Sequence, residues 1–121
     1  MSQRQDRRQA HRVLERLALS ITDGGGALHA ETQNLSTAGA YCTLDQWIAP
    51  MTKLQLDFEL PTAPKSSRVR CGGVIVRVEP IVASADRGRF HIAIFFSEIS
   101  ERDRAAIAEF VRQRLAARPA L

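Results

Sequence analysis

Apolar and polar side chains alternate strictly between residues 54 and 60, where leucine or phenylalanine occupies every second position. Successive side chains of a β-strand point to opposite faces of the sheet, so this pattern predicts a strand with one buried face. Similar short apolar runs predict further strands at 17–22, 28–33, 40–44, 74–79 and 90–96. A chain of about six short strands joined by tight turns is constrained to an antiparallel, mainly β architecture.

Glycines and polar residues mark the connections between these runs. Asp23-Gly24-Gly25-Gly26 predicts a glycine turn that joins the first two strands as a hairpin. Residues 65–67 are polar and predict a loop. Gly72-Gly73 lies at the start of the valine-rich run and predicts a β-bulge, after which the valines are expected to share one face of the strand.

The hydrophobic period changes near the C-terminal end. Ser100, with Asp103 three residues later, predicts a helix start of the capping-box type. Apolar residues then follow at helical spacing, namely Ile107, Phe110, Val111 and Leu115. They predict one amphipathic helix of roughly four turns that ends before Pro119. We therefore expect a small antiparallel barrel that this helix closes or flanks.

The length of 121 residues suits a single domain. Residues 1–12 are polar and rich in arginine, which predicts a flexible arm. Residues 13–118 are expected to form one barrel domain with its C-terminal helix. The formal net charge is +4, and Lys53 and Lys65 are the only lysines. The arginine fork suits phosphate groups and guanine edges, although an arginine-rich codon usage would produce the same bias.

Cys42 and Cys71 are the only cysteines, and their spacing suggests neither a disulfide scaffold nor a zinc site. They fit a reducing cytoplasm, so we expect a cytoplasmic protein. The first residues contain no apolar stretch typical of a signal peptide, and the apolar run at 92–96 is too short to span a bilayer. No set of serine, histidine and aspartate suggests a nucleophile with its base, and no metal-ligand spacing is found, so we expect no enzyme.

Two motifs suggest a binding site. The arm contains an Arg-x-x-x-Arg spacing at Arg8 and Arg12, with Arg7 directly before it. Asn34-Leu35-Ser36-Thr37-Ala38-Gly39 forms an Asn-x-Ser-x-x-Gly turn between two predicted strands. Asparagine and serine can bond a base edge or a phosphate oxygen, and glycine allows a positive φ or a close approach of the backbone. Each motif alone also fits an ordinary solvated leader or an ordinary polar turn.

Together, with one predicted hairpin between them, the two motifs resemble the signature of the PilZ domain family. The resemblance covers the whole chain. It implies a six-stranded antiparallel barrel with a C-terminal helix, a fold that the patterning predicts independently. It also implies a bacterial, non-enzymatic receptor that binds the second messenger cyclic di-GMP and needs no other cofactor.

The resemblance implies a role for each matching residue. Arg8 and Arg12 would grip phosphates and the O6/N7 edge of guanine, which offers two acceptors to one guanidinium. Asn34 and Ser36 would bond a guanine from the barrel surface, and Gly39 would keep the turn open. Arg7 precedes the arginine motif, and relatives with an arginine there often bind an intercalated dimer, so two nucleotides are expected.

Arg77 lies outside the two motifs. It is expected to point outward from its strand, either as a further ligand contact or as a plain solvent-exposed residue. When the nucleotide binds, the arm is expected to fold over it, and the changed surface would contact an unidentified downstream protein. We expect a monomer or weak dimer, no DNA binding and no membrane insertion.

Two other functions remain open. A degenerate PilZ adaptor would bind no nucleotide and act by protein contact, although the motif residues are intact. A small basic barrel could instead bind single-stranded nucleic acid, which requires exposed aromatic side chains among basic residues. Phe58, Phe90 and Phe96 occupy predicted inward positions, Phe95 is predicted to point outward, and Trp47 is expected to be a core or lid residue.

Overall fold

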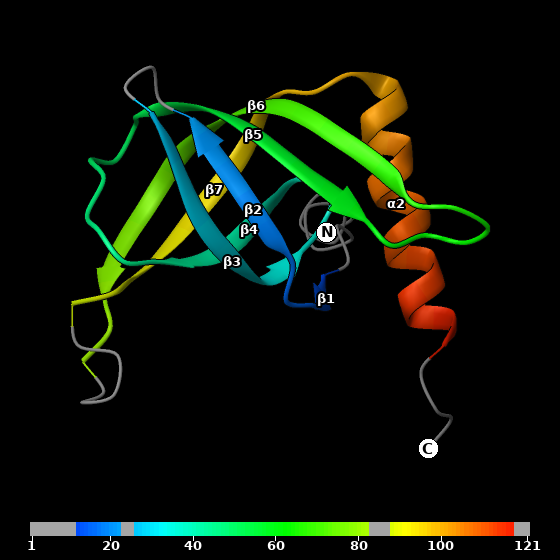
Figure 1. The fold of residues 1–121 in the computed structure, drawn as a ribbon, viewed down its shortest axis with the longest axis horizontal. Coiled ribbons are helices and arrows are strands. Elements are labelled where there is room, and N and C mark those ends of the chain that lie inside the picture. The colour runs from blue at the N-terminus through cyan, green and yellow to red at the C-terminus, as the bar shows by residue number, and fades with distance from the viewer. Residues whose placement is uncertain (1–11, 23–25, 83–87, 118–121) are drawn as a thin grey trace, which may run out of the picture.

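A computed structural model describes residues 12–22, 26–82 and 88–117. Its strands are β1 (Val13–Leu14), β2 (Ala18–Thr22), β3 (Ala27–Leu35), β4 (Gly39–Leu44), β5 (Lys53–Leu60), β6 (Ser67–Pro80) and β7 (Phe90–Glu98). They pair antiparallel in the order β1-β3-β2-β5-β6-β7-β4, and β4 returns to β3 (Figure 1). This pairing closes a six-stranded barrel to which β1 is added. The predicted barrel and its C-terminal helix are confirmed.

The predicted alternation places one face of each strand inside the barrel. Leu54, Leu56, Phe58 and Leu60 of β5 are all buried, and the Phe58 ring stacks on Phe96 of β7 at a centroid distance of 6.2 Å. Phe95 is 49% exposed, as predicted. Burying each such side chain contributes about 1.5–3 kcal/mol, so these inward rows supply much of the driving force for folding.

Strand β6 is longer than predicted. It begins at Ser67, so the polar loop ends one residue earlier than expected, and the glycine pair lies in its middle. The pairing register shifts between Gly72 and Gly73, so the predicted break lies at the glycine pair. Their partners are Glu98 and Phe96, so the extra residue is Ser97 of β7 and not a residue of β6.

A second register shift between Ile75 and Arg77 was not predicted. Because of it, Val76 and Arg77 are both exposed, and Val78 packs against the core. Val76, which is 53% exposed, and Val78 therefore lie on opposite faces, so the expectation that the valines share one face is wrong.

The short strand β1 was also missed by the sequence patterns. It pairs with the end of β3 through Val13↔Leu35 and Leu14↔Asn34, and it continues the edge on which β2 pairs. The buried side chain of Thr32 fills the break between β1 and β2. Its hydroxyl donates to the Glu15 carbonyl at 2.6 Å and accepts from the Leu17 amide at 2.8 Å. Together with the backbone bonds from Glu15 to Gln33 and from Thr32 to Leu17, this side chain satisfies the polar groups at the break.

Trp47 lies in the connection between β4 and β5 and is 58% exposed. The expectation of a core residue is therefore wrong. The neighbouring Ile48 is buried instead, and the Met51 amide donates to the Ile75 carbonyl at 2.7 Å. These contacts anchor the connection without the tryptophan ring.

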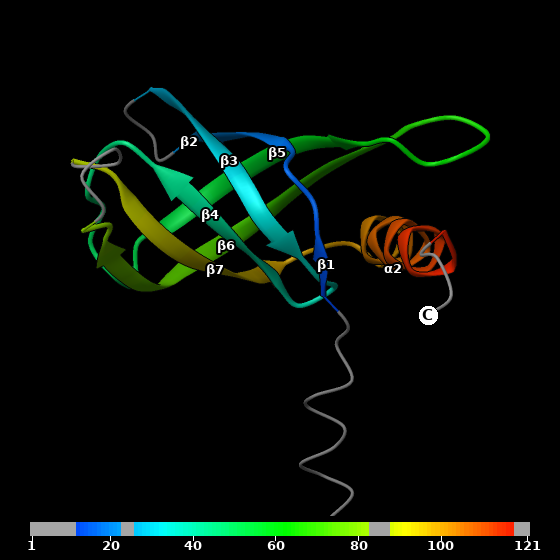
Figure 2. The ribbon, with the colours of Figure 1, turned by 90° about the horizontal axis from the view of Figure 1, so that it is seen from below.

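Helix α2 (Glu101–Ala116) lies against one end of the barrel rather than inside it (Figures 1 and 2). Its Ser100 N-cap accepts from the Asp103 amide, as predicted. Ile107, Phe110 and Val111 are its buried side chains. Arg114 packs over the Phe110 ring and forms an ion pair with Glu15 at 3.0 Å, which ties the helix to the segment after β1. No helix among the described residues is long and apolar enough to cross a membrane.

Burial predicts that both thiols are chemically inert in the folded protein. Cys42 and Cys71 are free and buried, and burial raises their pKa values to about 12 and about 11. A raised thiol pKa leaves little reactive thiolate at mildly alkaline pH. We expect slow reaction with Ellman's reagent in native buffer and rapid reaction of both thiols in concentrated guanidinium chloride. A thiol that reacts rapidly in the native protein would contradict this burial.

Candidate functional site

The turn between β3 and β4 is held by its own serine. The Ser36 hydroxyl accepts from the amides of Ala38 and Gly39 at 3.1 and 3.3 Å, and the Ser36 amide donates to the Gly39 carbonyl at 2.9 Å. Ser36 is fully buried. Its side chain therefore stabilises the turn in this structure and does not face the surrounding surface.

Gly39 is required for close packing rather than for an unusual φ. A Cβ atom at this position would lie 2.1 Å from the carbonyl oxygen of Ile94 on β7. Among the described residues, positive φ values occur at Gly26, Gly88 and Met51, and not at Gly39. The next contact along the turn is also with β7, where the Phe96 amide donates to the Ala38 carbonyl at 2.9 Å. The turn thus rests directly on β7.

Asn34 is turned outward by a bulge. The register between β3 and β4 shifts between Thr32 and Asn34, so Gln33 is the extra residue. Thr32 points inward and is buried, whereas Asn34 reaches the outer surface. There its Oδ1 atom accepts a hydrogen bond from Nη1 of Arg12 at 2.6 Å. Two predicted site residues, 22 positions apart in the sequence, are thereby in contact.

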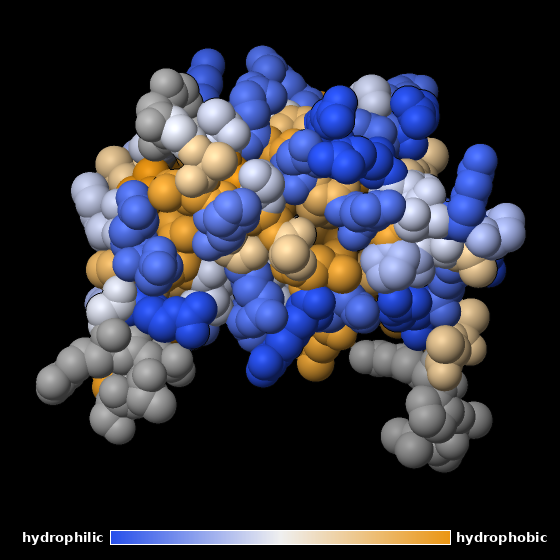
Figure 3. Space-filling model, viewed as in Figure 1, coloured by the Kyte–Doolittle hydropathy of each residue, from blue (hydrophilic) through white to orange (hydrophobic). Residues whose placement is uncertain are grey.

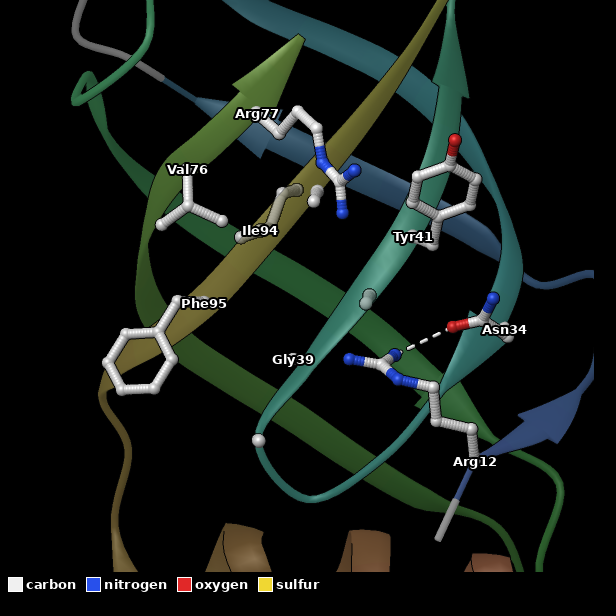
Figure 4. Close-up of a pocket in the computed structure, with 11 residues that line it drawn as sticks. Arg12, Asn34, Gly39, Tyr41, Val76, Arg77, Ile94 and Phe95 are labelled. Atoms are coloured by element: carbon white, nitrogen blue, oxygen red, sulfur yellow. Dashed lines mark hydrogen bonds between the residues drawn. The ribbon is translucent and has the colours of Figure 1, made fainter. Parts of the chain in front are cut away.

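A pocket of about 420 Å³ opens beside this pair on the outer face of the barrel. Figure 4 shows Arg12, Asn34, Gly39 and Arg77 around it. Its other lining residues come from β4, β6, β7 and the preceding turn, and they are Ala38, Ala40, Tyr41, Val76, Ala93, Ile94 and Phe95. Arg77 therefore lies at the pocket rather than on an unrelated surface. Ser36 does not line the pocket, and Arg7 and Arg8 lie outside the described residues.

Several lining residues were missed by the sequence analysis. Alternation in β4 places Tyr41 outward, because its neighbours Ala40 and Cys42 are buried. Alternation alone could have identified Tyr41 as a surface residue, but not the strands beside it. Their adjacency follows from pairing of β4 with β7 and of β7 with β6. Figure 3 shows that apolar and polar side chains are mixed on the face seen in Figure 1.

The pocket carries positive charge. Arg12 and Arg77 are its charged lining residues, and no carboxylate lines it among the described residues. Arg77 has one exposed ion pair, in which its Nη1 lies 3.6 Å from Oε2 of Glu79. Such exposed pairs stabilise by at most about 1 kcal/mol, so Arg77 remains available to an anionic or planar ligand. No cluster of three or more potential metal ligands occurs in the described part of the chain.

The turn is also tied to the C-terminal helix. Arg104 of α2 donates from Nη1 to the Thr37 carbonyl at 3.0 Å. One end of the pocket therefore contacts the helix through the turn.

Comparison with known proteins identifies the family. The model of the PilZ domain matches residues 6–113. No curated protein matches the sequence. MotI/DgrA, the inhibitor of motility from Bacillus subtilis, is similar in fold with a TM-score of 0.77 and 20% identity over 92% of this chain. The match covers 53% of MotI, so the chain spans about half the length of that protein.

Two further solved structures share the fold. The PilZ domain of YcgR from Escherichia coli, solved with c-di-GMP, has a TM-score of 0.65 and 11% identity, and the match covers 91% of this chain and 94% of that one. PlzA from Borreliella burgdorferi, in complex with c-di-GMP, has a TM-score of 0.55 and 16% identity, with coverage of 91% and 45%.

The contact between Gly39 and β7 predicts a strong effect of one methyl group. Gly39→Ala forces the backbone of the turn away from the Ile94 carbonyl and should destabilise the protein by about 1–3 kcal/mol. Gly72→Ala is the matched control, because its Cβ would lie 3.1 Å or more from every neighbouring atom, so a much smaller shift relieves the contact. Chemical denaturation of both variants provides the measurement. Equal stabilities would show that the close approach imposes no constraint.

Proposed function

The chain belongs to the PilZ domain family, and we propose that it is a cytoplasmic receptor that binds cyclic di-GMP and signals to a downstream protein without catalysing a reaction. The observation that carries this proposal is the hydrogen bond between Arg12 and Asn34. It brings the last arginine of the Arg-x-x-x-Arg motif to the Asn-x-Ser-x-x-Gly turn, at the edge of one positively charged pocket.

The chemistry of the pocket fits this ligand. Cyclic di-GMP carries two phosphate charges and two guanines, each with the O6 and N7 acceptors. Arg12 uses one N–H group on Asn34, which leaves further guanidinium donors for a phosphate or a guanine edge. The Asn34 amide group lies beside them and offers its own donors. A fixed pair of this kind recognises a base edge at little ordering cost.

Ser36 has an indirect role in this proposal. Its hydroxyl already binds two amides of the turn and is fully buried. We assign it the positioning of the turn, in place of the direct guanine contact that the family resemblance implies. Arg7 and Arg8 would complete the site from the arm, which folds over the bound nucleotide and changes the surface that the partner protein meets.

The neighbouring structures support the ligand class. The structures of the YcgR domain and of PlzA contain c-di-GMP, and both share the fold of this chain. MotI is described as an inhibitor of motility, which fits a PilZ protein that acts on another protein.

Substitution of Arg12 tests the proposed site. Arg12→Ala removes charge-assisted hydrogen bonds worth about 1.5–3 kcal/mol each, so cyclic di-GMP should bind roughly ten- to a hundredfold more weakly or undetectably. Arg12→Lys keeps the charge but loses the planar fork, and should restore only part of the affinity. Isothermal titration calorimetry measures both effects.

Arg102→Ala is the matched control, because Arg102 is exposed on α2 and does not line the pocket. It removes the same charge and should bind like the wild type. An equal loss in Arg102→Ala would indicate nonspecific attraction. If the wild type binds no cyclic di-GMP, the adaptor function replaces this proposal. Salt-sensitive binding of a fluorescent oligonucleotide would instead favour a nucleic-acid-binding barrel.

The number of bound nucleotides tests the role of Arg7. We expect the wild type to bind two cyclic di-GMP molecules per chain, and Arg7→Ala to bind one. The molar ratio in the same titrations, with sedimentation analysis of the complex, distinguishes these cases. A ratio of one for the wild type would show that Arg7 does not select an intercalated dimer.

A further inference from the structure

Three residues of the pocket form one row across three neighbouring strands. Ala93 on β7 is the register partner of Arg77 on β6 and of Tyr41 on β4. Paired strands lie about 4.8 Å apart, so the backbones at Tyr41 and Arg77 are separated by about 10 Å. Between them stands only the methyl group of Ala93. The row therefore has a large planar group at each end and a small side chain in the middle.

The unpredicted bulge in β6 creates this row. Ile75 points into the core, and strict alternation from it would turn residue 77 inward as well. The extra residue, Val76, resets the alternation, so that Arg77 is exposed and opposite Ala93. Bulges commonly re-aim a side chain at a functional site. Figure 4 shows the Arg77 guanidinium extending from β6 toward the side of the pocket where Tyr41 lies.

His91 supports the other end of the row. It lies two residues from Ala93 on the same strand, and its ring stacks on Tyr41 with a centroid distance of 5.2 Å and an interplanar angle of 20°. The His91 Nδ1 atom is buried and has no hydrogen-bond partner among the described residues. The stack on Tyr41 is the ring contact recorded for this imidazole, and it restricts the orientation of the phenol ring.

We propose that Tyr41, Ala93 and Arg77 form a base-binding slot, in which a purine ring lies over Ala93 between the phenol and the guanidinium, and that His91 positions Tyr41. The inference rests on the proposed function and names where one guanine of the dinucleotide lies. A ring with partners on both faces needs about 7–8 Å between them, since stacked carbon atoms lie about 3.5–4.0 Å apart. The separation of about 10 Å between the backbones at Tyr41 and Arg77 accommodates this width when both side chains stand away from the sheet.

The neighbouring groups fit the same ligand. Arg77 contacts Glu79 through one nitrogen, which leaves the faces of its guanidinium plane open to stacking. Arg12 and Asn34 lie at the same pocket and offer hydrogen-bond donors to polar edges and phosphates. Phe95 and Val76 supply apolar surface next to the row. Stacking in the slot and hydrogen bonding at Arg12 therefore act on different parts of one ligand.

Titrations of cyclic di-GMP into slot variants test the proposal. Tyr41→Ala should weaken binding about 5- to 100-fold, in line with the loss of one base stack, whereas Tyr41→Phe should bind like the wild type. Ala93→Leu should fill the slot and weaken binding at least as much. The matched control is Ala18→Leu on β2, since Ala18 is exposed and does not line the pocket.

Two further measurements separate positioning from general structural damage. His91→Ala should weaken binding and His91→Phe, which keeps a stacking ring, should restore it, with unchanged melting temperatures. In the wild-type complex, an NOE is expected between the Ala93 methyl protons and guanine H8. Wild-type affinity in Tyr41→Ala and Ala93→Leu, with binding still weakened at least tenfold in Arg12→Ala, would overturn the slot and leave the proposed function intact. Absence of wild-type binding would overturn both.

Discussion

Pairing of β3 with β4 closes the barrel, and the candidate site is built along this seam. The short turn between the two strands is compact because the Ser36 hydroxyl binds two of its amides, and because Gly39 lets it rest on the Ile94 carbonyl. The same pairing positions Asn34 at the end of one strand and Tyr41 near the start of the other. Without the seam, the pocket would lose two of the strands that line it.

Bulges decide which side chains reach the outer face. The extra residue in β3 allows Thr32 to point inward and Asn34 to point outward, only two positions apart. The extra residue in β6 does the same for Ile75 and Arg77. In a regular strand each pair would share one face, so the outward positions of Asn34 and Arg77 depend on local breaks in the strand pairing.

These breaks also explain what could be predicted from the sequence. Strict alternation in β5 predicted its bounds to within one residue and its buried face, because a single physical pattern governs the strand. The glycine pair Gly72-Gly73 predicted the position of one break in the strand pairing, since glycine commonly accompanies β-bulges. No glycine in the sequence marks the bulges at Gln33 and Val76. The two-residue strand β1 is too short to show an alternating pattern. The motifs predicted that Arg12 and Asn34 belong together, but the adjacency of Tyr41, Ala93 and Arg77 follows from long-range strand order.

The rigidity of the turn bears on how a ligand could be bound with useful affinity. The turn is held from within by Ser36, from β7 by the Phe96 amide and from α2 by Arg104. Glu15 and Arg114 hold the segment after Arg12 to the same helix. A ligand that meets preformed groups loses little free energy in ordering them. The turn and the segment after Arg12 therefore present their polar groups in a fixed arrangement before a ligand binds.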